Sequence, residues 1–298
     1  MRRVLYSIGL ILVAVVSIHG AVRFIGGAGL EPYDYRQDVM ITEYTDTASR
    51  FIDLDGSFNT RDIGGYPARE GMIARNTVYR SDHLHLLTDE DLKKITSLGI
   101  RTVIDLREPG RAETYPNRLP EEVISYELPI YDGTKPLHVP VLIRRNSISS
   151  YFQKSYVEYL DEWGHRFLPI FELISDPSAY PVLYHCSNGK DRAGVLTALL
   201  LDLAGVRREL IVSDFSLSNY HIEQVIEKFI DHEEGTLLMR LGVPREELSE
   251  LMGVRTQWIQ NLLDHIDMTY GSTRGYLEHI GISQGILTAV IGNITDAE

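Results

Sequence analysis

The stretch YPVLYHCSNGKDRAGVLTALLLDLAGV, residues 180–206, constrains the fold more than any other part of the chain. Its apolar start predicts a short buried strand that ends near His185. The apolar run after Arg192 predicts a helix, which Gly205 closes. A strand, a glycine-containing loop and a helix in this order are typical of α/β folds, in which ligands bind at the carboxyl ends of the strands. The only cysteine of the chain, Cys186, stands at that point.

The remaining pattern from residue 51 onward also alternates between strands and helices. Thr88 and Asp91 form a capping-box signature at the start of one predicted helix. We expect strands over residues 77–79, 100–107, 123–133 and 180–185, helices over 88–99, 150–175 and 193–206, and a succession of helices from 207 to 293. The pattern therefore predicts an α/β fold with a central, mostly parallel sheet flanked by helices, formed by residues 51–298.

The N-terminus differs from the rest of the chain. In residues 1–24, Arg2 and Arg3 precede an apolar run from Val4 to Val22, which is typical of a signal peptide or a transmembrane anchor. We expect membrane attachment through residues 4–22 and a location outside the cytoplasm, in the periplasm or at the inner membrane, or secretion if the segment is cleaved. Residues 25–50 are polar and glycine-bearing, and they read as a linker.

Charge and cysteine content exclude several classes of function. The formal net charge of −13 argues against general nucleic-acid binding, which needs a basic face. A single cysteine excludes an intramolecular disulfide and a metal site built from several cysteines. His83 and His85 lack a nearby carboxylate pattern, so we interpret them as exposed turn residues and expect neither a metal nor a cofactor.

The loop from Cys186 to Arg192 has the composition of an oxyanion site. Its backbone N–H groups and the following helix N-terminus can converge on one anion, and Gly189 permits a tight turn. Arg192 can bind two oxygens of that anion, and the same positive field favours a thiolate at Cys186. A thiolate beneath a bound phosphate is a nucleophile directed at phosphorus. A buried structural cysteine is the alternative. A sulfurtransferase loop would be one residue shorter, and an arsenate-reductase relay needs further cysteines.

The sequence HCSNGKDRAG, residues 185–194, resembles the signature of an atypical bacterial branch of the cysteine-dependent tyrosine and dual-specificity phosphatases. FNTRDIGGY (58–66), the segment 78–113 with its D-L-R, and YGSTRGYLEHIGIS (270–283) are similar to other elements of this family. The resemblance covers about residues 51–285. It implies a cysteine-phosphatase fold and hydrolysis of phosphomonoesters through a phosphocysteine intermediate, with phosphorylated proteins, phosphoinositides or inositol phosphates as substrates.

The resemblance also implies roles for individual residues. Cys186 is the expected nucleophile, and Arg192 holds the phosphoryl group. Lys190 is expected to favour polyanionic substrates, and His185 to tune the thiolate through the backbone. The phosphate cradle comprises Ser187, Asn188, Gly189, Lys190 and Asp191, and the expected bracing residues are Arg61, Asp62, Asp105 and Arg107.

Two aspartates are candidates for the general acid that protonates the leaving oxygen. The family is thought to use the loop aspartate, here Asp191. Asp132 lies in ELPIYDGTKP, whose P-x-x-D pattern is similar to the acid loop of dual-specificity and tensin-homologue phosphatases. A simple turn residue before Gly133 is the alternative for Asp132. Both aspartates stay candidates at this point.

One position departs from the family pattern. The residue after the arginine is normally Ser or Thr, whose hydroxyl assists the departing thiolate, but here it is Ala193. Without this hydroxyl, hydrolysis of the phosphocysteine is expected to be slower unless another hydroxyl replaces it, and phosphate binding is not affected. The leading hypothesis is a protein-tyrosine-phosphatase-type enzyme. The alternatives are a phosphoinositide or inositol-phosphate phosphatase and, from another class, a catalytically weak phosphate-binding module.

Overall fold

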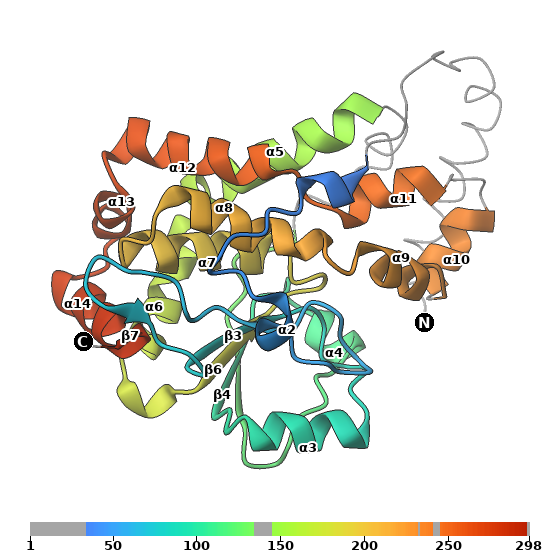
Figure 1. The fold of residues 1–298 in the computed structure, drawn as a ribbon, viewed down its shortest axis with the longest axis horizontal. Helices are drawn as coiled ribbons and strands as arrows, with labels where there is room; N and C mark the ends of the chain where they lie inside the picture. Colours follow the sequence, from blue (N-terminus) through green and yellow to red (C-terminus); the bar gives the residue numbers. More distant parts are fainter. Residues whose placement is uncertain (1–33, 134–144, 232, 241–244, 297–298) are drawn as a thin grey trace.

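The computed structural model describes residues 34–133, 145–231, 233–240 and 245–296. A five-stranded sheet lies at its centre in the order β1-β3-β6-β4-β5 (Figure 1). β3, β6, β4 and β5 pair in parallel, and only β1 runs antiparallel, against β3. The predicted α/β fold with a mostly parallel sheet is therefore confirmed. The sheet consists of β1 (Arg61–Asp62), β3 (Val78–Ser81), β6 (Val182–His185), β4 (Thr102–Asp105) and β5 (Ile124–Glu127), and a separate pair joins β2 (Met72–Ile73) to β7 (Thr295–Asp296).

Helices flank the sheet (Figure 1). One face is covered by α3 (Asp89–Ser97), and α4 (Arg111–Thr114) follows β4. The main helical layer comprises α5 (Arg145–Asp161), α6 (Leu168–Ile174), α7 (Arg192–Leu203), α8 (Arg208–Ser216), α12 (Thr256–Tyr270), α13 (Thr273–His279) and α14 (Gln284–Ile294). Away from the sheet lie α9 (Ile222–Asp231), α10 (Glu233–Arg240) and α11 (Arg245–Met252), while α2 (Thr47–Arg50) and the 3₁₀ helices η1 (Tyr35–Asp38), η3 (Gly164–Phe167), η4 (Pro177–Ala179) and η5 (Leu217–Asn219) occupy connections.

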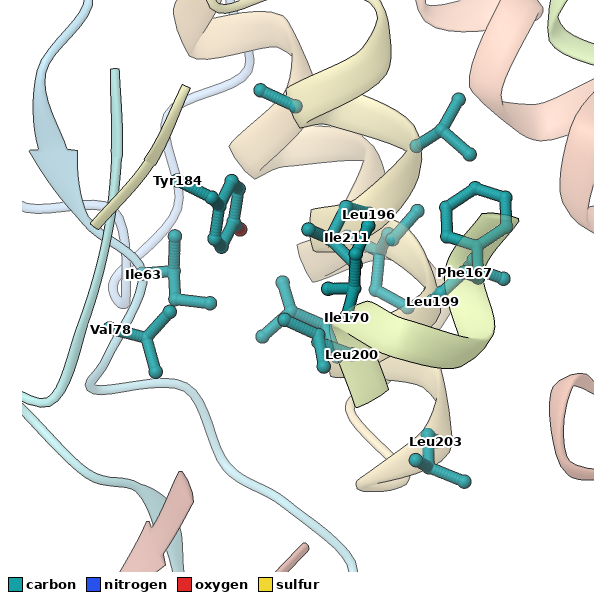
Figure 2. Packing of buried hydrophobic residues seen from close by; sticks show 14 of the residues in the cluster. Ile63, Val78, Phe167, Ile170, Tyr184, Leu196, Leu199, Leu200, Leu203 and Ile211 are labelled. Atoms are coloured by element: carbon teal, nitrogen blue, oxygen red, sulfur yellow. The ribbon is translucent and has the colours of Figure 1, made fainter. Parts of the chain in front are cut away.

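The central strand β6 separates two hydrophobic clusters. Val182 and Tyr184 belong to the larger cluster with α6, α7 and α8, whereas Leu183 belongs to the smaller one with Ile95 of α3. Figure 2 shows Tyr184 pointing from the sheet toward the side chains of the helical layer, among them Leu196. This alternation follows from the two-residue period of a strand. It explains why β6 is apolar from Val182 to Tyr184, since both of its faces are covered.

The predicted helix over 88–99 is present with its capping box. The Thr88 hydroxyl accepts from the Asp91 N–H at 3.2 Å, and the Asp91 carboxylate accepts from the Thr88 N–H at 2.9 Å. The predicted helix over 150–175 is interrupted after α5. A Cβ at Gly164 would lie 2.6 Å from the Tyr276 hydroxyl, so only glycine allows this close approach, and α6 begins with proline in its first turn.

The predicted membrane segment, residues 4–22, lies outside the described residues, and membrane attachment stays a prediction. Within the described ranges, no helix is long and apolar enough to cross a membrane. Residues 34–50, the second half of the predicted linker, pack onto the domain. Tyr35 and Arg50 are buried, and the Arg50 guanidinium donates to the carbonyl oxygens of Asp62 and Gly64 at 2.8 Å. The buried Arg50 guanidinium therefore holds this part of the segment against the domain. The polar composition of the segment does not predict this contact.

Candidate active site

The loop after β6 is anchored to both neighbouring strands. The Leu106 N–H, at the end of β4, donates to the carbonyl of His185 at 2.9 Å. The His83 N–H, after β3, donates to the carbonyl of Ser187 at 3.2 Å. Cys186 between them is buried, with 1% of its surface exposed. The loop therefore lies at the carboxyl ends of three parallel strands, as the sequence predicts.

The middle of the loop is held by two side chains from distant segments. The Arg80 guanidinium donates to the carbonyl of Gly189 at 2.7 Å, and the Asn59 amide donates to the carbonyl of Asn188 at 2.9 Å. Gly189 has a φ of +65°, and a Cβ there would lie 2.6 Å from the backbone nitrogen of Asp82. The glycine is thus required both by conformation and by close packing.

Arg192 opens α7 and turns back along the loop. Its guanidinium pairs with Glu108 at 2.5 Å and lies 3.3 Å from the Ser187 hydroxyl. Burial alone would lower the pKa of Arg192, but the neighbouring Cys186 and the ion pair with Glu108 outweigh it and raise that pKa. Arg192 therefore stays charged beside the thiol, and its planar fork can bind two oxygens of a phosphoryl group.

Glu108 is a site residue that the sequence analysis missed. It lies after the D-L-R, where β4 ends, and its second oxygen pairs with Arg111 at 3.2 Å. Burial acts to raise the pKa of Glu108, but the charge of Arg192 lowers it overall. Glu108 fixes the orientation of the Arg192 guanidinium. The signal available in the sequence was its position after a buried parallel strand.

The candidate acid Asp191 is held by two donors. Its Oδ1 accepts from the Tyr156 hydroxyl at 2.7 Å and from Lys190 Nζ at 2.9 Å. Burial, together with the charge of Asp191, raises the pKa of Tyr156 far above its usual value, so this phenol stays a donor. The carboxyl group is thereby fixed at the N-terminus of α7.

Lys190 does not have the position that the sequence predicts for a substrate lysine. It is 1% exposed, and its Nζ lies 3.8 Å from the ring centroid of Phe152 and 5.6 Å from that of Trp258. The ammonium group is compensated by these rings and by Asp191 rather than by solvent. The structure thus directs Lys190 inward, toward α5 and α12.

Asp132, the second candidate acid, lies five residues after the end of β5. It is half-buried in the connection after β5. A Cβ on the following residue, Gly133, would lie 3.5 Å from the Cβ of Glu108. Asp191 therefore stands in the loop itself, and the connection that carries Asp132 passes beside Glu108, the partner of Arg192.

His185 connects the loop to the predicted bracing pair. Its Nε2 lies 3.0 Å from the Asn117 amide nitrogen, which also donates to Asp105 at 3.1 Å. Asp105 forms a buried ion pair with Arg107 at 2.5 Å. Nδ1 lies 3.2 Å from the carbonyl oxygen of Cys186, so these contacts fit a neutral ring protonated on Nδ1. Asn117 was not predicted, because it lies in an irregular segment with no periodicity.

We predict that His185 makes the protein less stable in acid. Burial lowers its pKa from 6.5 to about 4, although Asp105 acts in the opposite direction. Because the unfolded chain takes up a proton below pH 6.5 and the folded one does not, stability falls as the pH drops from 6.5 toward 4. The free energy of unfolding should lose about 2 kcal/mol through this residue between pH 7 and pH 5.

Urea unfolding of the wild type, of His185→Asn and of His279→Asn at several pH values checks this prediction. The asparagine at 185 keeps a donor for the Cys186 carbonyl but does not titrate, so the pH slope should flatten. His279 is exposed, and its replacement should leave the slope intact. Equal slopes in all three proteins would contradict the assignment.

Arg61 and Asp62, the other predicted bracing residues, have different roles. Arg61 is fully buried and shares Asp214 of α8 with Arg80, at 3.4 and 2.8 Å. Burial and the charge of Arg80 lower the pKa of Arg61 to about 10, against the effect of Asp214. Arg61 thus supports the loop through Asp214 and Arg80. Asp62 instead accepts from the N–H groups of Gly64 and Asn76 at 2.8 and 3.0 Å, and so braces the connection between β1 and β3.

His83 and His85 are half-buried rather than exposed. Their rings contact each other at 4.5 Å, and His85 also packs against Tyr115 at 5.1 Å. The prediction that both histidines are exposed is wrong, because their rings pack against each other and the His85 ring also packs against Tyr115. In the described part of the chain, no group of three or more His, Cys, Asp or Glu side chains is arranged to hold a metal ion.

Comparison with known proteins gives a consistent result. A model of the family described as "Tyrosine phosphatase family" matches residues 52–295. A tyrosine-protein phosphatase of Nostoc commune is 28% identical over 222 residues, covering 72% of this chain and 73% of that protein. The triple specificity protein phosphatase PtpB of Mycobacterium tuberculosis is 28% identical over 277 residues, covering 80% and 97%. Among solved structures, the core catalytic domain of the PP-IP phosphatase SIW14 of S. cerevisiae covers 63% of this chain and 95% of its own, at 16% identity and a TM-score of 0.32.

Proposed function

Since this chain belongs to the tyrosine phosphatase family, we propose that it hydrolyses phosphotyrosine in proteins through a phosphocysteine on Cys186. The chain is a phosphatase of the protein-tyrosine-phosphatase type, and the proposal concerns its substrate and the roles of its residues. The observation that carries the proposal is the loop from Cys186 to Arg192. It combines a buried thiol, a charged guanidinium and a helix N-terminus at the carboxyl ends of three strands.

An aromatic wall beside the loop supports an aromatic phosphomonoester. The wall consists of Tyr131 and Tyr159, which are half-buried and contact each other at 6.5 Å, and Tyr159 stacks on the buried Tyr156 at 6.3 Å. A phenyl ring that enters with its phosphate can pack against such a wall. The inositol-phosphate alternative is based on Lys190, which is expected from the sequence to favour polyanionic substrates. Its ammonium group is instead buried against Phe152. We therefore place phosphotyrosine first.

The residues suggest the following two-step reaction. Sγ of Cys186 attacks phosphorus, the P–O bond to the leaving group breaks, and an aspartic acid gives that oxygen its proton. Arg192 and the loop N–H groups bind the equatorial oxygens, where negative charge gathers in the transition state. Water then attacks the phosphocysteine, its proton passes to the same aspartate, and the thiolate leaves.

We predict that Asp191→Asn and Asp132→Asn separate the two candidate acids. Loss of the true acid should lower kcat for a phosphotyrosine peptide about 10²- to 10⁴-fold, with a smaller loss for p-nitrophenyl phosphate, whose leaving group needs little protonation. Because Asp191 is held by Tyr156 and Lys190 at the loop itself, we expect the larger loss at Asp191.

The pH dependence of kcat gives an independent measure of the acid. In the variant that lacks the acid, kcat should no longer decline at alkaline pH. In the other variant, kcat should still decline there. A loss confined to Asp132→Asn would transfer the role to Asp132. Equal activity of both variants on the peptide would contradict general-acid catalysis by either residue.

A substrate panel tests the proposal as a whole. Values of kcat/KM are compared for phosphotyrosine, phosphoserine and phosphothreonine peptides of one sequence, and for inositol phosphates. Preference for the phosphotyrosine peptide is expected. Preference for an inositol phosphate would replace phosphotyrosine as the substrate class, and binding of these compounds without any hydrolysis would favour the phosphate-binding module.

A further inference from the structure

The loop lacks a hydroxyl at the start of α7. Ala193 is completely buried and provides only a methyl group. The nearest hydroxyl on the same helix, at Thr197, donates to the Ala193 carbonyl at 2.7 Å and lies 2.7 Å from the Tyr184 hydroxyl. The Thr197 hydroxyl therefore already has its hydrogen-bond partners beneath the loop. The Ser187 hydroxyl lies 3.3 Å from Arg192, whose orientation it supports.

Tyr159 packs against one tyrosine that binds Asp191 and against another that precedes Asp132 in the sequence. It lies three positions after Tyr156, so both side chains lie on one face of α5. Their rings are nearly parallel, at 23°, and Tyr156 reaches Asp191 with its hydroxyl. On the opposite side, Tyr159 contacts Tyr131, the residue that precedes Asp132. Arg192, Asp191 and Cys186 all act on the pKa of the Tyr159 phenol, so its hydroxyl lies within electrostatic range of the loop that Tyr156 contacts.

The charges around Tyr159 are those of the active site. Burial raises the pKa of Tyr159, with Arg192 acting against this and Asp191 and Cys186 adding to it. The phenol thus stays protonated and can donate throughout the physiological pH range. The Tyr156 hydroxyl donates to Asp191, whereas no hydrogen bond links the Tyr159 hydroxyl to any other residue in the described part of the chain.

We propose that the Tyr159 hydroxyl donates a hydrogen bond to the phosphoryl group during transfer and so supplies a donor that Ala193 cannot. This inference rests on the proposed function. In both steps the donor adds to Arg192 and the loop N–H groups, and it gives up no proton. In the second step the O–P bond to water forms, the S–P bond breaks with its electrons passing to sulfur, and the water proton goes to the carboxylate.

The test is Tyr159→Phe, which removes the hydroxyl and keeps the ring. We expect kcat for p-nitrophenyl phosphate to fall about 10- to 100-fold, because one donor to the transition state is lost. The inhibition constant of inorganic phosphate should rise several-fold, and the Tm should change little. The matched control is Tyr270→Phe, whose hydroxyl binds Asp161 at the end of α5, and its kcat should equal that of the wild type.

The outcomes separate this inference from the proposed function. Unchanged kcat and unchanged phosphate inhibition in Tyr159→Phe, with an active wild type, would overturn the role of Tyr159 alone. A parallel loss in Tyr270→Phe would also overturn it, since the effect would then come from the packing of α5. An inactive wild type would count against the phosphatase activity itself.

Discussion

Cys186→Ser is expected to lose hydrolysis of p-nitrophenyl phosphate by a factor on the order of 10⁴ or more. A serine hydroxyl at this position is a far weaker nucleophile than a thiolate, and the sequence contains no other cysteine that could replace Cys186. The measurement is the initial rate at saturating substrate, for both proteins, with and without EDTA. The chelator should not affect the wild type, because the attacking group is a side chain.

The serine variant should still bind phosphate. The cradle consists of Arg192, the loop N–H groups and the bracing contact of Arg80 with Gly189, all of which are retained. Calorimetric titration with inorganic phosphate should therefore give a Kd close to that of the wild type. Residual hydrolysis within tenfold of the wild type would contradict the nucleophilic role of Cys186.

Arg192→Lys should lower kcat about 10²- to 10³-fold, although the charge is kept. Lysine offers a point charge, whereas arginine offers a planar fork that binds two oxygens at once. A lysine at this position also cannot reproduce both contacts that fix the Arg192 guanidinium, with Glu108 at 2.5 Å and with Ser187 at 3.3 Å. The steady-state rate and the inhibition constant of phosphate together measure the effect.

Arg111→Lys provides the matched control for this variant. Arg111 pairs with the other oxygen of Glu108 and lies half-exposed over Tyr115, so it receives the same substitution outside the phosphate loop. Its kcat should stay within a few-fold of the wild type. A loss at position 111 as large as that at position 192 would show that the arginine fork is not the source of the effect.

The sequence predicts the central part of the site because that part is local. The strand, the loop and the helix from Val182 to Leu203 are contiguous, and each has its own signal in apolar pattern, glycine position or helix start. Cys186, Gly189 and Arg192 therefore occupy their expected places. The parallel sheet follows in the same way, since a buried strand in the middle of a sheet is apolar on both faces.

The residues that orient this loop are not local and were missed. Glu108, Asn117 and Asp214 are separated from it in sequence, and each acts through a pairing that only the fold creates. The hints available beforehand are a carboxylate in the mostly apolar segment 210–217, for Asp214, and the position after a buried strand, for Glu108. The pairing also decides function, because Glu108 determines where the Arg192 guanidinium points.

For Lys190 the residue is in the loop as predicted, but its side chain points the other way. A lysine in an anion-binding loop suggests contact with substrate, but the direction of its side chain depends on the residues that pack behind the loop. Here Phe152 and Trp258 offer ring faces and Asp191 offers a charge, which together compensate the burial of the ammonium group. The three compensating groups come from α5, α12 and the neighbouring position, a combination that the local sequence does not encode.

The most direct test of the account is to trap the covalent intermediate. The protein is mixed with a phosphotyrosine peptide or p-nitrophenyl phosphate, quenched with acid within milliseconds, digested and examined by mass spectrometry. The account predicts one added phosphoryl group on the peptide that contains Cys186, absent in Cys186→Ser. Turnover of substrate with no phosphoryl group on Cys186 at any quench time, or with the group on another residue, would contradict it.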